Sequence, residues 1–137
     1  MASATKSNIY FFFQTDAPLR ERTRLKQFVA GIFKKEKRKL ESLNFIFCTD
    51  DQILEINQQY LKHDYYTDII TFELSPKHEP IQGEVYISID RVRENAALHE
   101  ETFRNELHRV IFHGALHLCG YKDKSTKETD VMRGMEA

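Results

Sequence analysis

The stretch Val110–Cys119 constrains the fold more than any other part of this sequence. It reads VIFHGALHLC, and its only polar side chains are two histidines. A helix that is apolar almost all round must be buried on most of its circumference. The preceding turns are amphipathic, so we expect one helix from near Glu101 or Thr102 to about Cys119. The sequence therefore predicts a histidine-bearing helix in the middle of the fold, with the other elements packed around it.

Four short segments have the β-branched and aromatic composition that is typical of strands. They cover residues 9–13, 43–47, 69–72 and 84–89. A short connector joins the third and fourth segments, so we expect these two strands to pair antiparallel. Apolar residues at helical spacing, or capping residues, predict helices over residues 18–33, 50–60 and 90–97, and a polar helix from about residue 126.

This order of strands and helices predicts an α/β (α+β) fold with a mixed sheet of about four strands. The chain has 137 residues, of which 41% are hydrophobic, so it is long enough to bury a core. We find no internal repeat, low-complexity tract or linker. We therefore expect a single domain over residues 1–137.

Charge is distributed unevenly along a chain whose formal net charge is only -1. Residues 20–39 carry nine Lys and Arg against two acidic residues, whereas residues 40–137 carry ten against eighteen. A basic helix on an otherwise acidic protein favours an anionic partner such as RNA. The alternative is an ordinary solvated helix face, and the charges alone do not decide between the two.

The cysteines and the apolar runs indicate the cellular compartment in which this protein is expected. Cys48 and Cys119 are too few for a disulfide framework and are typical of a reducing cytosol. Cys119 neighbours His117, but on a helix it points away from the histidine edge, which favours core packing over metal binding. The N-terminal apolar run is too short for a signal peptide, and no run reaches transmembrane length. We expect a cytoplasmic protein with no membrane partner.

His113 and His117 are four residues apart, so they lie on one side of the predicted helix. Gly120 is expected to end that helix, since glycine takes positive φ without a Cβ clash. The chain can then turn back and bring Asp123 close enough to be a third ligand. Two imidazoles and a carboxylate, with room for water, are typical of a catalytic divalent-metal site. Such a site activates water near neutral pH, which predicts a metal-dependent hydrolase.

Gly114 stands where zinc peptidases of the H-E-x-x-H type place their general base. That peptidase mechanism therefore lacks its base here. Two other functions stay open. One is a structural metal that ties the helix to the following loop, and the other is hydrolysis of a different small substrate. A structural zinc site is closed by four protein ligands, and the sequence offers no clear fourth ligand.

Three blocks of this sequence resemble the YbeY family of bacterial rRNA maturation factors. The family pattern His-Gly-x-Leu-His-Leu-x-Gly-Tyr is matched over residues 113–121, and Asp123 stands where many members have a third metal-binding histidine. Residues 57–72 resemble the second block of the family, and residues 83–88 resemble the strand that borders its cleft. The three blocks occur in the family's order between about residues 53 and 123.

The resemblance implies a metal-dependent, single-strand-specific endoribonuclease. Its implied setting is maturation of the 3′ end of small-subunit rRNA and ribosome quality control in a bacterial cytoplasm. The implied partners are single-stranded rRNA and the ribosome or its small subunit, and no DNA is expected. His113, His117 and Asp123 would hold one divalent metal, most simply zinc, with nickel or manganese as alternatives.

The substrate contacts are expected on several separate segments. Many family members carry an arginine where this chain has Leu61, so Lys62 and His63 are the candidates to contact phosphate. Glu84 is the candidate for a base that orients water, with Asp68 as its alternative. The residues expected to steer the RNA backbone lie on the basic helix; they are Arg20, Arg24, Lys34 and Lys35.

A different class of function remains as the alternative. The protein would then be a non-catalytic ribosome-assembly or RNA-binding module whose metal is structural. Open coordination at the metal distinguishes a catalytic site from this structural one.

Overall fold

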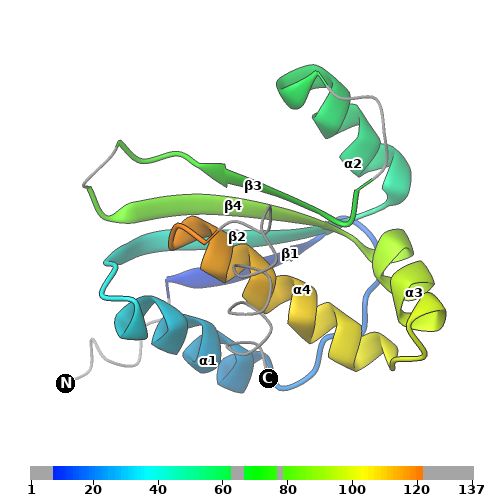
Figure 1. Cartoon of the computed structure of the whole chain (residues 1–137), viewed down its shortest axis with the longest axis horizontal. Helices are drawn as coiled ribbons and strands as arrows, with labels where there is room; N and C mark the ends of the chain where they lie inside the picture. The colour runs from blue at the N-terminus through cyan, green and yellow to red at the C-terminus, as the bar shows by residue number, and fades with distance from the viewer. Residues whose placement is uncertain (1–7, 63–66, 77–78, 122–137) are drawn as a thin grey trace.

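The computed structural model describes residues 8–62, 67–76 and 79–121 (Figure 1). The strands are β1 (Ile9–Phe13), β2 (Leu40–Cys48), β3 (Ile69–Glu73) and β4 (Ile81–Ser88). The α-helices are α1 (Arg22–Lys35), α2 (Asp50–Ile56), α3 (Ile89–Leu98) and α4 (Phe103–Leu118), and a short π-helix, η2 (Asn57–Leu61), continues α2. The predicted closing helix from residue 126 lies outside the described residues.

The strands form one mixed sheet in the order β1-β2-β4-β3. β1, β2 and β4 run parallel to one another, and β3 pairs antiparallel with β4. The predicted α/β fold with a four-stranded mixed sheet and an antiparallel third and fourth strand is therefore confirmed.

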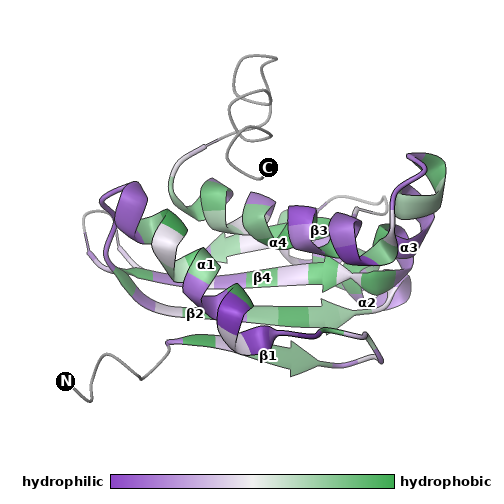
Figure 2. Ribbon diagram, turned by 90° about the horizontal axis from the view of Figure 1, so that it is seen from below, coloured by the Kyte–Doolittle hydropathy of each residue, from purple (hydrophilic) through white to green (hydrophobic). Residues whose placement is uncertain are grey.

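The main core lies between one face of the sheet and the helices α1 and α4 (Figure 2). Successive strand residues point to opposite faces, so paired residues of neighbouring strands share a face. Phe45 and Val85 are such a pair, and both are fully buried. Phe11 of the edge strand packs near Phe45 with the two rings tilted by 38° and their centroids 5.7 Å apart. The aromatic first strand is therefore partly core.

Helix α4 is the central helix that the apolar stretch predicted. Nine of its residues are buried, and it contacts α1, α3, β3 and β4. Its approach to the sheet is close because Gly114 faces the strands. A Cβ built at Gly114 would lie 2.8 Å from Val85 Cγ1 and 3.1 Å from Ile69 Cδ1. Because Gly114 has no side chain, α4 lies close to the sheet, and the neighbouring His113 comes near Ile69 at the start of β3.

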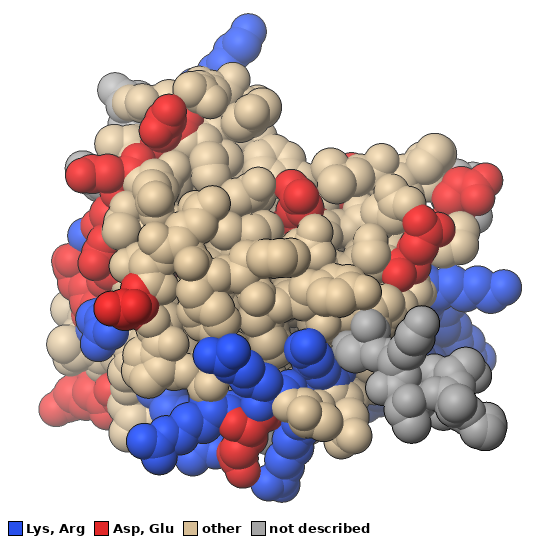
Figure 3. All heavy atoms as spheres, turned by 180° about the vertical axis from the view of Figure 1, so that it is seen from behind, with Lys and Arg blue, Asp and Glu red and all other residues tan. Residues whose placement is uncertain are grey.

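Among the described residues, the opposite face of the sheet is covered at one end only. Ile53 of α2 packs there on Cys48 and Ile70. Tyr10 and Phe12 of the edge strand remain 46% and 48% exposed on this face. Figure 3 shows the molecule from behind, with a broad uncharged expanse and Lys and Arg side chains gathered below it.

Two helix caps differ from the sequence prediction. Thr49, not Asp50 or Asp51, caps α2, because its side chain and that of Gln52 form a reciprocal capping box. Ser88, not Asp90, caps α3 by accepting from the backbone N–H of Arg91. In both places the cap lies at the last strand residue or directly after it, so the strand leads into the helix with no loop. None of the helices in residues 8–62, 67–76 and 79–121 is long and apolar enough to cross a membrane.

Candidate metal and substrate site

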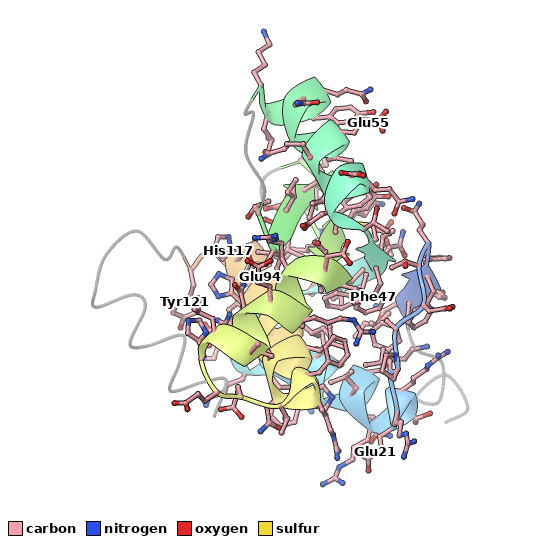
Figure 4. The ribbon with its side chains drawn as sticks, turned by 90° about the vertical axis from the view of Figure 1, so that its right-hand side faces the viewer. Glu21, Phe47, Glu55, Glu94, His117 and Tyr121 are labelled. Atoms are coloured by element: carbon pink, nitrogen blue, oxygen red, sulfur yellow. The ribbon has the colours of Figure 1, made fainter. Side chains whose placement is uncertain are left out.

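The two predicted ligands of α4 lie together. The rings of His113 and His117 stack with their centroids 4.8 Å apart and their planes inclined by 26°. Both side chains are partly buried, and Nε2 of His117 is shielded from solvent. In Figure 4, His117 lies on the same side of the view as Tyr121, across from Phe47 in the core. The i, i+4 spacing therefore produces the paired imidazoles that the sequence predicted.

The histidines line a cavity of about 350 Å³ between α4 and the start of β3. Its other lining residues are Thr67, Asp68, Ile69, Arg109 and Val110. The lining thus joins α4 to residues about 45 positions earlier in the chain. It offers a carboxylate, a guanidinium and two imidazoles around one opening.

The turn after the histidines is a Schellman motif, which confirms Gly120 as the helix stop. The backbone N–H of Tyr121 donates to the carbonyl of Leu116, and the N–H of Gly120 donates to that of His117. Gly120 has a φ of 108°, which L side chains rarely adopt. Tyr121 Oη then donates to Oε1 of Glu36, the C-cap residue of α1, at 2.9 Å. The chain therefore leaves α4 in a defined direction, but Asp123 lies outside the described residues.

Asp68 supplies the carboxylate of this cavity. From the sequence it was only the alternative to Glu84 as the base that orients water. Burial raises the pKa of Asp68 above its ordinary value, and the nearby Arg109 and His113 oppose this shift. Its backbone carbonyl accepts from the N–H of Ser88, which ties the start of β3 to the end of β4. The side chain is therefore placed by the sheet and faces the histidines.

Glu84 does not reach this cavity, which corrects its expected role as the water-orienting base. Gly83 and Val85 face α4, so Glu84, between them, points to the other face of the sheet. There it pairs laterally with Phe72 and accepts from Tyr86 Oη at 3.2 Å. Its sequence neighbours Gly83 and Val85 face the helix that carries the histidines, but the Glu84 side chain lies on the other side of the sheet.

None of the predicted RNA-contacting cations that the structure describes lines the histidine cavity. Lys62 is exposed at the end of η2, in a left-handed conformation, and His63 lies outside the described residues. Arg20 lines a second cavity, together with Arg104 and His108. Arg24 is 83% exposed and pairs with Glu21 at 3.7 Å.

Lys34 and Lys35 are exposed near the end of α1, and Lys35 borders a groove between α1 and α4. Helix α1 contacts α4, whereas the histidine cavity opens at β3. The basic helix is therefore on the far side of α4 from the cavity. Contact between its cations and an RNA backbone stays a prediction.

A metal ligand set is only partly contained in the described residues. Within them, no group of three His, Cys, Asp or Glu lies close enough together to hold a metal ion. The chemistry of the two imidazoles fits zinc or another transition metal, and one more ligand has to come from elsewhere. Asp123 follows the Schellman turn by three residues and stays the predicted third ligand.

Cys119 is not among the residues that line the cavity. Burial raises the pKa of its thiol to about 12, with Glu36 adding to the shift. A thiol binds metal as the thiolate, so this environment disfavours ligation. The side chain packs against the main core, in agreement with the sequence interpretation.

The sequence reasoning missed Arg109, which lines the cavity, and its partner Glu106. Glu106 is 2% exposed and accepts from Arg109 Nε at 3.2 Å and Nη2 at 2.7 Å. Arg109 Nη2 also lies 3.9 Å from Asp68 Oδ2. The available signal was spacing, because Arg109, His113 and His117 follow one another at i, i+4.

Comparisons with known proteins agree with the fold and with the motif. The family model described as "Endoribonuclease YbeY" matches residues 12–137. A protein of Cytophaga hutchinsonii with that description is 50% identical over 133 residues, which cover 96% of this chain and 93% of its own. One of Flavobacterium psychrophilum is 47% identical over 128 residues, covering 93% of this chain and 91% of its own.

A solved structure extends the likeness to three dimensions. The solution structure of TM1509 from Thermotoga maritima superposes with a TM-score of 0.67 at 32% identity, covering 93% of this chain and 86% of that one. The paired histidines, their apolar helix and the four-stranded mixed sheet thus occur in a chain that matches one family over nearly its whole length. The chain belongs to the endoribonuclease YbeY family, a family of hydrolases.

Proposed function

We propose that this protein is a metal-dependent endoribonuclease that cleaves single-stranded RNA in the cavity between α4 and β3. The observation that supports this most is the stacked pair His113 and His117, which line the cavity together with Asp68. His113, His117 and Asp123 would hold one divalent ion, most simply zinc. When bound, such an ion supplies a nucleophile from water near neutral pH and offsets charge on phosphoryl oxygens.

Asp68 replaces Glu84 as the candidate that orients the attacking water. Its carboxylate lines the same cavity as both imidazoles, whereas Glu84 lies behind the sheet. A base must come within hydrogen-bond reach of the proton that it accepts, directly or through one water. Only Asp68 of these two carboxylates lies on the correct side of the sheet for that task.

The substrate follows from the family. Relatives at 50% and 47% identity carry the description "Endoribonuclease YbeY", which implies an RNA substrate. We infer that the biological setting is 3′-end maturation of small-subunit rRNA and ribosome quality control. The alternative, an assembly module with a structural metal, would bind RNA or ribosomes with no turnover.

Removing and restoring the metal tests this function. We expect about one divalent transition-metal ion per chain, and we expect a chelator to abolish cleavage of a labelled single-stranded RNA. Addition of zinc, nickel or manganese should restore cleavage, because water activation depends on the ion. Elemental analysis and gel-resolved cleavage on the same preparation provide both readouts, with a duplex of the same sequence as the control substrate.

Two results would count against the proposal in different ways. Metal uptake with no cleavage, but with RNA or ribosome binding intact, would favour the assembly module. A wild-type protein that takes up none of the three metals would remove the basis for a metal site altogether.

A further inference from the structure

We propose that Arg109 binds the phosphate backbone of the substrate at the histidine cavity, with Glu106 as the positioning residue that orients its guanidinium. The inference rests on the proposed function, because it concerns the substrate of the same site. It adds a substrate-binding residue that lies on the metal-binding helix itself.

Arg109 shares the cavity with the paired imidazoles. It lies four residues before His113 and eight before His117, so the three side chains form one stripe along α4. Among the described residues that line this cavity, Arg109 is the only lysine or arginine. A phosphodiester that enters the cavity would therefore meet its positive charge beside the predicted metal ligands.

Glu106 holds the guanidinium in one orientation. Its carboxylate is 2% exposed and accepts from both Nε and Nη2 of Arg109, at 3.2 and 2.7 Å. A guanidinium is a planar fork with five N–H donors, and this bidentate contact occupies the edge between Nε and Nη2. The bidentate contact thus fixes the plane of a guanidinium that is still 37% exposed, and a guanidinium is the side-chain group whose geometry matches phosphate oxygens.

The exposures of the two partners differ, which bears on the alternative of a purely structural ion pair. The Glu106 side chain is 2% exposed, while that of Arg109 is 37% exposed. Burying a charge is costly unless it is paired, which accounts for the contact of Glu106 with Arg109 but does not require Arg109 to remain exposed. Here the Glu106 carboxylate is enclosed, whereas the Arg109 guanidinium opens on the cavity, as expected of an arginine that binds a ligand.

Asp68 completes this arrangement from the strand side. Its Oδ2 lies 3.9 Å from Nη2 of Arg109, which is longer than a hydrogen bond. The guanidinium is thereby flanked by Glu106 on its own helix and by Asp68 across the cavity. An incoming phosphate would compete with the weaker of these contacts, the one to Asp68, and leave the bidentate contact in place.

Binding measurements test the assignment without relying on cleavage. The probe is a short fluorescein-labelled single-stranded oligoribonucleotide, and a chelator in the buffer keeps it intact. The double variant Glu106→Gln/Arg109→Gln removes the buried charge together with its partner, so the fold is preserved; circular dichroism verifies this. We expect its affinity for the probe to fall about tenfold, the effect of losing one charge-assisted contact.

The salt dependence separates a phosphate contact from a structural effect. Each phosphate neutralised on a single strand contributes about 0.7 to the slope of log K against log salt concentration. We expect the double variant to lose about that much slope. Arg109→Lys should keep the slope but bind more weakly, because lysine is a point charge with no fork. The matched control is Arg104→Gln, which removes an arginine of the same helix that pairs with Glu21 outside this cavity.

The outcomes distinguish this inference from the proposed function. If the wild type binds and cleaves RNA and the double variant keeps both affinity and slope, the role of Arg109 is overturned while the function stands. An equal loss in Arg104→Gln would also overturn it, because the effect would then be general charge. A wild type that neither binds nor cleaves RNA would overturn both proposals.

Discussion

Replacing His117 with alanine is expected to remove the metal and with it the RNA cleavage of this protein. His117 and His113 are the two ligands that α4 supplies, and their rings lie 4.8 Å apart. Loss of a residue that merely supports a metal ligand costs about 10–100-fold in metal affinity or activity. Loss of a ligand should exceed this range, so we expect cleavage to fall by at least about 100-fold.

The measurement compares metal content and cleavage in the same preparations of both proteins. His108→Ala is the matched control, because His108 lies on the same helix, is half-buried and lines a different cavity with Arg20 and Arg104. We expect His108→Ala to retain both metal and cleavage. His117→Ala with full metal content would show that the stacked pair is not the metal site, whatever the activity.

Replacing Gly114 with valine is expected to destabilise the fold strongly. A Cβ at this position would lie 2.8 Å from Val85 Cγ1 and 3.1 Å from Ile69 Cδ1, both in the sheet beneath α4. Extra carbons in a packed core cost about 1–3 kcal/mol each time neighbours are forced to shift. Valine adds three carbons, so we expect a loss of about 3 kcal/mol, a large part of the 5–15 kcal/mol typical of a domain.

Alanine substitutions at two glycines isolate the cause. Alanine favours a helix over glycine by about 1 kcal/mol, and this gain applies equally at Gly114 and at Gly31. Nothing lies within 4 Å of a Cβ at Gly31, so Gly31→Ala should be stabilising. Gly114→Ala should be destabilising, because the contact with Val85 outweighs the helix gain. Urea midpoints measure both, and equal shifts of the same sign would contradict close packing as the reason.

Much of the secondary structure could be predicted because local chemistry specifies it. Residues 9–13 form the predicted strand, and α4 is the predicted central helix that ends before Gly120. Hydrophobic spacing and one glycine were sufficient there. The differences lie at helix starts, such as Thr49 in place of Asp50 or Asp51, where several capping residues compete within a few positions.

The histidine pair could also be predicted from the sequence, because the helix repeat brings residues i and i+4 together. The carboxylate beside the pair, that of Asp68, could not. Glu84 and Asp68 stand equally near strand boundaries in the sequence, but the side of the sheet on which α4 packs decides between them. That choice depends on Gly83 and Gly114, which allow the close approach, and it leaves Glu84 on the other face.

The contacts of Arg109 with Glu106 and Asp68 also divide into one that the local sequence determines and one that depends on tertiary packing. The local sequence places Arg109 on the histidine stripe of α4 and makes Glu106 its neighbour at i−3. Asp68 joins them only because β3 pairs antiparallel with β4 and starts beneath the helix. Short-range periodicity therefore specifies which side chains share a helix face, while contacts across about 45 residues depend on how sheet and helix pack.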